Sequence, residues 1–179
     1  MDVLSLLKED HRTVAALLDE AQECEPGDRR LDGLATKIEK ALTVHAAIEE
    51  KFFYPMLRER SEESEDSVDV FEAYTEHELV KRLIALLKSG RQPAEKFKAE
   101  LQVLGENVKH HVKEEESTIF GLARQLLARE ELEELGEEMA AAKRQMTAAS
   151  RNGARRKTPA RKTARSRKTT GARTRRKTR

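Results

Sequence analysis

The sequence contains very few of the residues that cross-link or anchor small folds. Cys24 is the only cysteine among 179 residues, so neither an internal disulfide nor a cysteine-based zinc finger can form. No apolar run reaches the roughly 18 residues that are needed to span a bilayer, and the N-terminal run is too short for a signal peptide. These absences exclude a disulfide-rich secreted domain and a membrane protein, and they favour a cytoplasmic protein.

Residues that interrupt helices and strands are also scarce, with 8 glycines and 4 prolines. Apolar residues recur at intervals of three and four, which favours helices and argues against strands. We expect helices over about 2–24, 30–57, 68–88, 93–127 and 129–146, a loop over 61–67, and a C-terminal cap at Ser89-Gly90. The fold class is therefore all-α, an up-down-up-down four-helix bundle with a short extra C-terminal helix.

The formal net charge of +2 conceals two oppositely charged parts. Of the 35 basic residues, 14 lie in 151–179, where no acidic residue occurs. Residues 1–150 therefore contain all 33 acidic residues and the other 21 basic residues, which gives this part a net charge of −12. Such a division predicts a folded acidic body, 1–147, followed by a basic tail, 148–179.

An internal repeat with an offset of 66 residues relates the two halves of the body. Each half has a lone histidine on its first helix and a histidine four residues before a glutamate on its second. The surrounding apolar residues follow the same offset, so a chance match is improbable. The six repeated polar residues are His11, His45 and Glu49, and His77, His111 and Glu115.

A histidine and a glutamate four residues apart lie on one side of a helix, about 5.4 Å apart along its axis. One such pair is a weak signal, and a lone histidine on an apolar stripe is more often a core residue than a ligand. Here all six lie within apolar stripes, where unpaired carboxylates are costly unless cations accompany them. We therefore predict a metal site, with His110 and Glu114 as flanking residues. A buried hydrogen-bond network without metal is the structural alternative.

Six mixed ligands are too many for one zinc ion, and calcium and magnesium prefer oxygen ligands alone. Imidazole with carboxylate suits iron or manganese, and a carboxylate can bridge two ions. If both glutamates bridge, each ion has four protein ligands, and two positions remain for water, hydroxide, oxo or an external ligand. The pattern thus predicts a two-metal centre that is open to small molecules.

These residues resemble the hemerythrin-like, or HHE cation-binding, domain over about 1–147. The resemblance implies a four-helix bundle around two Fe ions with an oxo or hydroxo bridge, and a function in binding, sensing or detoxifying O2, peroxide or nitric oxide. Oxygen carriers of this family have two histidines one turn apart on the third helix, whereas the positions one turn either side of His77 are Ala73 and Lys81. Their last carboxylate is an aspartate at a longer spacing, where this chain has Glu115. This chain is more similar to the four-histidine members, for which we expect peroxide-consuming, catalase-like reactivity. Iron storage or reversible O2 binding is the alternative.

Two tyrosines lie near the repeated residues. Tyr74 is on the expected inward stripe one turn before His77, where its hydroxyl either bonds the metal bridge or fills the core with another partner. We expect Tyr54 to serve packing alone. The inward stripe of its helix is expected to continue from Glu49 through Phe52 and Met56.

The tail has no bulky apolar residue and is predicted to be disordered. Its composition resembles the tails of linker histones and histone-like bacterial proteins. Non-specific DNA or RNA binding, and with it a nucleoid location, is the first expectation; a clamp on the acidic body is the alternative, and no membrane association is expected. The predicted nucleic-acid contacts are Arg155, Arg156, Lys157, Arg161, Lys162, Arg165, Arg167, Lys168, Arg173, Arg175, Arg176 and Lys177.

Overall fold

The computed structural model describes residues 1–61, 64–88 and 92–156, and all regular structure in these ranges is helical. The expected all-α class is confirmed for this part of the chain. The segments are α1 (Val3–Glu23), α2 (Arg30–Ile48), η1 (Glu49–Phe53), α3 (Tyr54–Arg60), α4 (Ser64–Leu87), α5 (Ala94–Glu114), η2 (Glu115–Ile119), α6 (Phe120–Leu126) and α7 (Arg129–Arg156).

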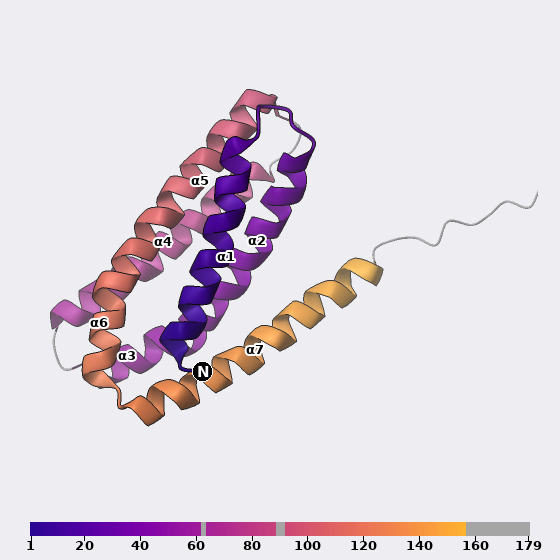
Figure 1. Cartoon of the computed structure of the whole chain (residues 1–179). Helices are drawn as coiled ribbons and strands as arrows, with labels where there is room; N and C mark the ends of the chain where they lie inside the picture. The colour runs from indigo at the N-terminus through magenta and orange to yellow at the C-terminus, as the bar shows by residue number, and fades with distance from the viewer. Residues whose placement is uncertain (62–63, 89–91, 157–179) are drawn as a thin grey trace, which may run out of the picture.

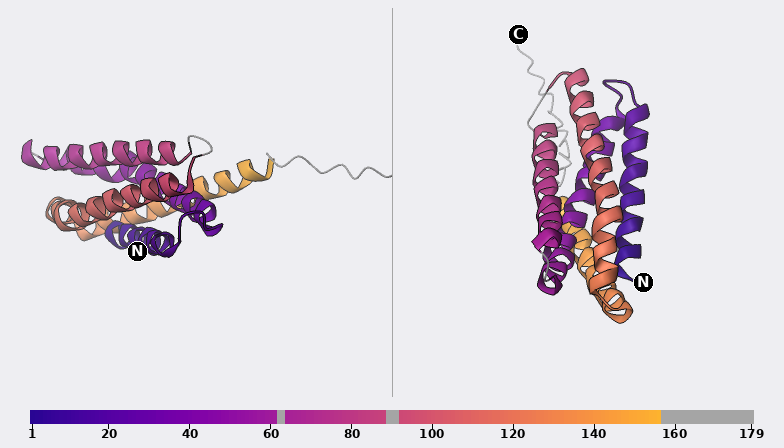
Figure 2. Two further views of the ribbon diagram at one scale, coloured as in Figure 1. Left: turned by 90° about the horizontal axis from the view of Figure 1, so that it is seen from above. Right: turned by 90° about the vertical axis from the view of Figure 1, so that its left-hand side faces the viewer.

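Long helical rods lie side by side in the described part of the chain (Figure 1). The first rod is α1, the second is α2 continued by η1 and α3, the third is α4, and the fourth is α5 continued by η2 and α6. The most extensive packing is between α1 and α2 and between α4 and α5, so each sequence repeat forms its own helical hairpin. The final helix, α7, crosses the bundle and contacts α1 and α2 (Figure 2).

The ends of α1 show how the sequence defines a rod. Asp2 caps the first turn, because its Oδ1 accepts a hydrogen bond of 2.9 Å from the backbone N–H of Ser5. At the other end, buried Lys98 of α5 donates to the carbonyl oxygens of Ala21 and Gln22 at 2.7 and 2.8 Å. This ammonium binds carbonyl groups of the last turn, where the helix makes few hydrogen bonds of its own; the Ala21 oxygen also accepts a hydrogen bond of 3.4 Å from the Cys24 N–H.

Both η1 and η2 are π-helical turns, and each begins at a repeated glutamate. Pro55 does not explain this geometry by itself, since the second of these turns has Gly121 at the equivalent position. The extra residue in a π turn rotates the remainder of the rod about its axis, and this rotation overturns the expected stripe. Phe53, Tyr54 and Leu57 are fully buried, while Phe52 and Met56 are only partly buried.

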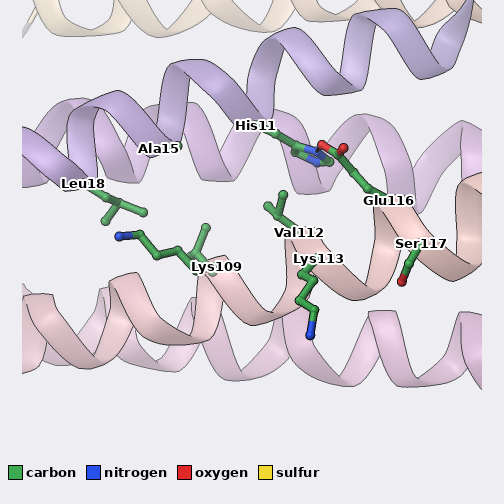
Figure 3. A pocket seen from close by; sticks show the side chains of 9 residues that line it. His11, Ala15, Leu18, Lys109, Val112, Lys113, Glu116 and Ser117 are labelled. Atoms are coloured by element: carbon green, nitrogen blue, oxygen red, sulfur yellow. Dashed lines mark hydrogen bonds and ion pairs between the residues drawn. The ribbon is translucent and has the colours of Figure 1, made fainter.

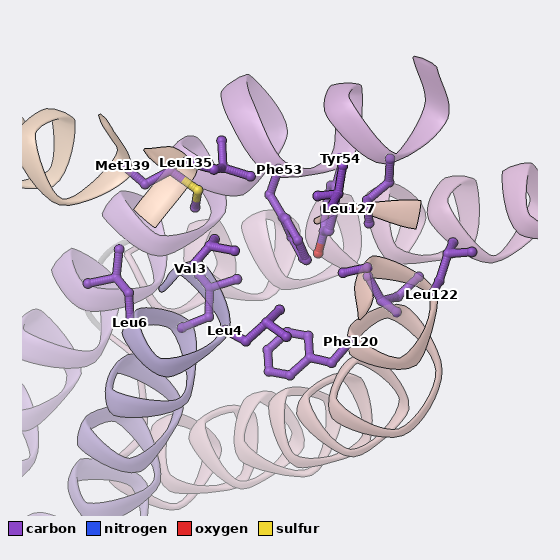
Figure 4. Packing of buried hydrophobic residues seen from close by; sticks show 14 of the residues in the cluster. Val3, Leu4, Leu6, Phe53, Tyr54, Phe120, Leu122, Leu127, Leu135 and Met139 are labelled. Atoms are coloured by element: carbon purple, nitrogen blue, oxygen red, sulfur yellow. The ribbon is translucent and has the colours of Figure 1, made fainter. Parts of the chain in front are cut away.

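Along each rod, apolar residues fill the core on both sides of the buried polar residues. One cluster lies towards α7 and contains Phe53, Tyr54, Phe120 and Met139 (Figure 4). The other lies towards the α1–α2 turn and contains Leu18, Ile38 and Leu104. In α1, for example, His11 comes between Leu7 of the first cluster and Val14 of the second. The polar residues are therefore enclosed between two dry regions.

Two helix boundaries differ from expectation. Helix α4 begins at Ser64 instead of Val68, and α7 continues past Met146 to Arg156, which makes the first part of the expected tail helical. The cap expected at Ser89-Gly90 lies outside the described residues. Gly136 allows α7 to approach the chain start closely, because a Cβ there would lie 2.7 Å from backbone atoms of Asp2 and Val3. Among the described helices, none has both the length and the apolar character needed to cross a membrane.

Candidate metal centre

All six repeated residues point into one buried site at the middle of the bundle. The two glutamates are at most 1% exposed and the four histidines at most 5%. Each rod contributes, with histidines from α1, α2, α4 and α5 and the glutamates from the two π turns. The predicted residues are thus brought together, and the alternative pair on the fourth rod is not: His110 and Glu114 are exposed.

The donor atoms fall into two groups that are compact enough to hold a metal ion each. The first contains His11, His45, Glu49 and Glu115, and the second contains Glu49, His77 and His111. Glu49 belongs to both, with Oε1 3.2 Å from His45 Nε2 and Oε2 3.4 Å from His77 Nε2. It is therefore placed to bridge two ions.

Glu115 is placed differently from Glu49. Its Oε2 lies 3.1 Å from His11 Nε2 but 4.0 Å from His111 Nε2. Its Oε1 accepts a hydrogen bond of 3.0 Å from the Tyr54 hydroxyl. Whereas two equally bridging glutamates were expected, only Glu49 spans both groups, because Tyr54 occupies one oxygen of Glu115.

Each histidine has an acidic partner beside its outer nitrogen, Nδ1. Glu116 lies 2.8 Å from His11, Glu50 2.9 Å from His77 and Glu76 2.8 Å from His111, while Asp10 is 3.6 Å from His45. In the three closer pairs the carboxylate fixes the proton on Nδ1 and directs the lone pair of Nε2 inward, whereas Asp10 and His45 are farther apart than a hydrogen bond allows.

These acids follow the same 66-residue offset as the ligands, since Asp10 corresponds to Glu76 and Glu50 to Glu116. The expected site omitted all four as supporting groups. The repeat contained the signal: an acid precedes each α1 and α4 histidine and follows each buried glutamate.

The inner nitrogens of the histidines meet in pairs. His11 and His45 have their Nε2 atoms 3.2 Å apart, and His77 and His111 have theirs 3.1 Å apart. Two lone pairs at this distance repel each other unless a cation lies between or beside them. A proton can do this in the metal-free protein and a metal ion in the loaded one.

The two buried carboxyls respond oppositely to this environment. Burial, followed by the charge of Glu115, raises the pKa of Glu49 well above its usual value. Burial also disfavours charge on Glu115, but hydrogen bonding and charge from His11, with the charge of His111, lower its pKa. The metal-free site therefore holds a proton on Glu49 beside an ionised Glu115.

The histidines are also divided. Burial lowers the pKa of His45 to about 4 and lowers that of His77. Burial opposes charge on His11 as well, yet the adjoining carboxylates of Glu115 and Glu116 raise its pKa above the usual value. Neutral imidazole is the form that binds metal, so His45 and His77 are ready to act as ligands near neutral pH.

The expectation for Tyr54 was wrong, whereas for Tyr74 the second alternative, a core residue with another partner, is confirmed. Tyr54 is fully buried at the site, with its hydroxyl 3.0 Å from Glu115 Oε1 and 3.4 Å from His77 Nε2. Tyr74 instead donates to the backbone oxygen of Glu50 at 3.3 Å. The π turn accounts for the exchange, because it carries the residue five positions after Glu49 inward.

The C-terminal helix reaches the outer side of the site through one ion pair. Lys143 of α7 bonds Asp10, the acid beside His45. Burial would raise the pKa of Asp10, but contacts with His45 and Lys143 lower it. The predicted nucleic-acid contacts cannot be placed in the same way: Arg155 and Arg156 fall on the last turn of α7, and the others lie outside the described residues.

Comparisons with known proteins identify relatives of this chain. The family described as the hemerythrin HHE cation binding domain matches residues 2–123, which include all six ligand candidates. A DNA nickase from Nostoc sp. is 33% identical over 143 residues, which are 80% of this chain but 39% of the nickase. This chain thus spans about two fifths of that relative's length.

A crystal structure of a hemerythrin HHE cation binding domain-containing protein from Mycobacterium kansasii is also similar. Its TM-score is 0.74 at 25% identity, over 88% of this chain and 94% of that one. The match of the family over most of the chain, together with the clustered histidines and glutamates, shows that the chain belongs to the hemerythrin HHE cation-binding domain family.

Proposed function

We propose that the chain holds two iron ions among its four histidines and two glutamates, and that it binds, senses or detoxifies O2, hydrogen peroxide or nitric oxide. Bound iron would supply redox chemistry and exchangeable coordination positions. The protein supplies the ligands, keeps bulk water out and holds protons at defined atoms around the site.

The observation that carries this proposal is the unmet bonding capacity of the buried carboxylates. Both oxygens of Glu49 and Oε2 of Glu115 have no hydrogen-bond partner within the described residues, although both side chains are 0% exposed. Leaving such groups unsatisfied is costly, and a metal ion in each donor group satisfies all three oxygens and the inward lone pairs of the histidines.

The size of the ligand follows from burial. With at most 5% of any of the four histidines exposed, a large substrate has no contact with the inner nitrogens. Diatomic gases and peroxide are small enough to approach a closed centre of this kind. The same burial argues that a DNA strand does not reach the site.

We further propose that the basic C-terminal segment associates with nucleic acid. Fourteen basic residues without an acid favour a phosphate backbone, and the relative from Nostoc sp. carries the name DNA nickase. Since the centre is buried, association is proposed and cleavage by the metal centre is not. Retention of the full chain on duplex DNA at low salt, compared with a chain lacking 151–179, tests this. Equal retention would refute it.

Metal analysis with an absorption spectrum, on protein from iron-supplied cells, tests the central proposal. Two iron ions per chain and a charge-transfer band are expected. The neighbouring residues His111 and His110 offer a matched pair, because the first is 4% exposed and the second is exposed. His111→Ala should lose iron and His110→Ala should keep it; two irons in both would refute the assignment.

A turnover assay distinguishes an enzyme that consumes peroxide from a protein that only stores iron or binds O2 reversibly. The two inequivalent donor groups favour turnover, since an acid, a tyrosine hydroxyl and histidines of different pKa surround one site. Oxygen evolution from hydrogen peroxide by iron-loaded protein is expected. A reversible oxygen adduct without peroxide consumption would favour the carrier.

A further inference from the structure

An open groove lies between α1 and α5 and ends at the outer side of His11, one of the candidate metal ligands. Its volume is about 470 Å³, and its walls include Ala15 and Leu18 of α1 and Val108 and Val112 of α5. Figure 3 shows His11 and Glu116 in contact at one end of this groove. The groove therefore leads from solvent to the outer side of a histidine whose inner nitrogen belongs to the first donor group.

The internal repeat allows a comparison with the opposite side of the bundle. There the equivalent pair is His77 with Glu50, and the equivalent of Ala15 is Lys81. The Lys81 ammonium lies 2.9 Å from Glu50 Oε1 and 3.0 Å from Oε2, so its side chain covers the pair. Ala15 presents only a methyl group, which leaves the equivalent space on the α1 side open.

A second difference between the halves has the same effect. The position one turn before the histidine is Lys8 in the first half and Tyr74 in the second. Tyr74 packs over Glu50, with a hydrogen bond to its backbone, whereas Lys8 is 3.5 Å from Glu116 and 37% exposed. The second half is covered on both sides of its histidine, and the first half is open on the Ala15 side.

We propose that the α1–α5 groove is the route by which a small neutral molecule reaches the first metal position, and that Ala15 keeps this route open. The walls are chiefly apolar, which suits O2, nitric oxide or undissociated hydrogen peroxide. Glu116 lies at the inner end of the groove, and Lys109 and Lys113 also line it. The inference rests on the proposed function, because a route matters only if a ligand binds at its end.

The chain offers matched variants for a test. Ala15→Leu fills the groove, whereas Ala16→Leu places the same side chain on the exposed side of α1. Lys81→Ala uncovers the opposite pair. In stopped-flow experiments with reduced, iron-loaded protein, Ala15→Leu should slow nitric oxide association about tenfold, equivalent to a barrier higher by about 1.4 kcal/mol. Ala16→Leu should have no effect, and Lys81→Ala, which uncovers the equivalent space in the second half, should raise the rate.

Xenon gives a readout that does not depend on iron reactivity. Methyl NMR spectra of the wild-type protein under xenon should shift at Ala15, Leu18 and Val112, and Ala15→Leu should abolish the shifts at the other two residues. Absence of these shifts in the wild type, or an unaltered association rate in a folded Ala15→Leu protein with full iron, would overturn the route. If the protein binds no iron, the proposed function fails by itself, and the xenon result still decides whether the groove admits small apolar molecules.

Discussion

The Tyr54 hydroxyl donates a hydrogen bond of 3.0 Å to Glu115, and this bond breaks the symmetry of a site built from a repeat. The repeat-equivalent residue is Phe120, which has no hydroxyl and stacks on His11 with ring centroids 5.9 Å apart. Four histidines, two glutamates and four outer acids are paired by the repeat. Tyr54 thus makes the two donor groups chemically different.

Removing this hydroxyl should make the two metal positions more alike. In Tyr54→Phe, Glu115 Oε1 is released and becomes free to approach the second donor group as Glu49 does. Mössbauer spectra of iron-loaded protein should show two distinct quadrupole doublets in the wild type and a smaller difference in the variant. The loss of one buried hydrogen bond should also cost about 1 kcal/mol of stability.

Phe120→Tyr is the reciprocal control, since it adds a hydroxyl at the equivalent position of the other half. It should change the doublet that Tyr54→Phe leaves unaltered. Identical spectra for the wild type and Tyr54→Phe would contradict the asymmetric assignment.

The contact between Lys143 and Asp10 should strengthen iron binding from outside the site. Lys143→Met removes the cation that helps to lower the Asp10 pKa, so the support that this carboxylate gives to His45 becomes weaker. Loss of the carboxylate itself would typically cost at least about tenfold in metal affinity, so Lys143→Met, which keeps the carboxylate, should have a smaller effect. Iron transfer to a chelator should therefore be faster in the variant. Arg144→Met, which changes an exposed side chain on the same helix, should have no effect.

Sequence reasoning identified the ligand candidates because burial and repetition reinforce each other. An ionisable residue on an apolar stripe is unusual. Six such residues, related three to three by an offset of 66 positions, have few explanations. The acids beside the outer nitrogens were missed for the opposite reason. In a chain with 38% charged residues, an acid next to a histidine is ordinary until the fold shows that it points at Nδ1.

The π turns were the other feature that periodicity could not supply. An ideal helical count from Glu49 places Phe52 and Met56 inside, whereas the inserted residue buries Phe53, Tyr54 and Leu57. A π turn depends on what the tertiary structure gains by rotating the helix, here the placement of a carboxylate and an aromatic ring at one centre. Local sequence preference therefore indicated the extent of the rod but not the direction of its side chains.

The close approach of α7 to the chain start should make Gly136 intolerant of a side chain. A methyl group in Gly136→Ala would meet the backbone of Asp2 and Val3 at 2.7 Å, so the helix must move away from the core residues that it covers. Overpacking of this kind costs about 2 kcal/mol. Urea unfolding measures the loss.

Gly33→Ala is the matched control, because no atom lies within 4 Å of a Cβ at this exposed position of α2. Alanine there should stabilise the helix by up to about 1 kcal/mol. If both variants gained stability alike, α7 would not pack against the start of α1 as the structure shows.

Acidification should release the metal well before the carboxyls reach their ordinary pKa values. Metal binding requires Glu49 ionised and His11 neutral, and the metal-free site raises the pKa of both. Because the pKa of each group is raised, protons begin to compete with the metal at a higher pH than they would at an ordinary glutamate or histidine. Metal affinity therefore falls as pH falls and rises as pH rises. Dialysis of iron-loaded protein between about pH 8 and about pH 5, followed by metal analysis, should show progressive loss that begins above the usual histidine pKa of about 6.5. Circular dichroism on the same samples shows whether the helices persist while iron is lost. Iron content that stays constant down to about pH 5, and then falls only with the helical signal, would mean that protons and metal do not compete for these two residues.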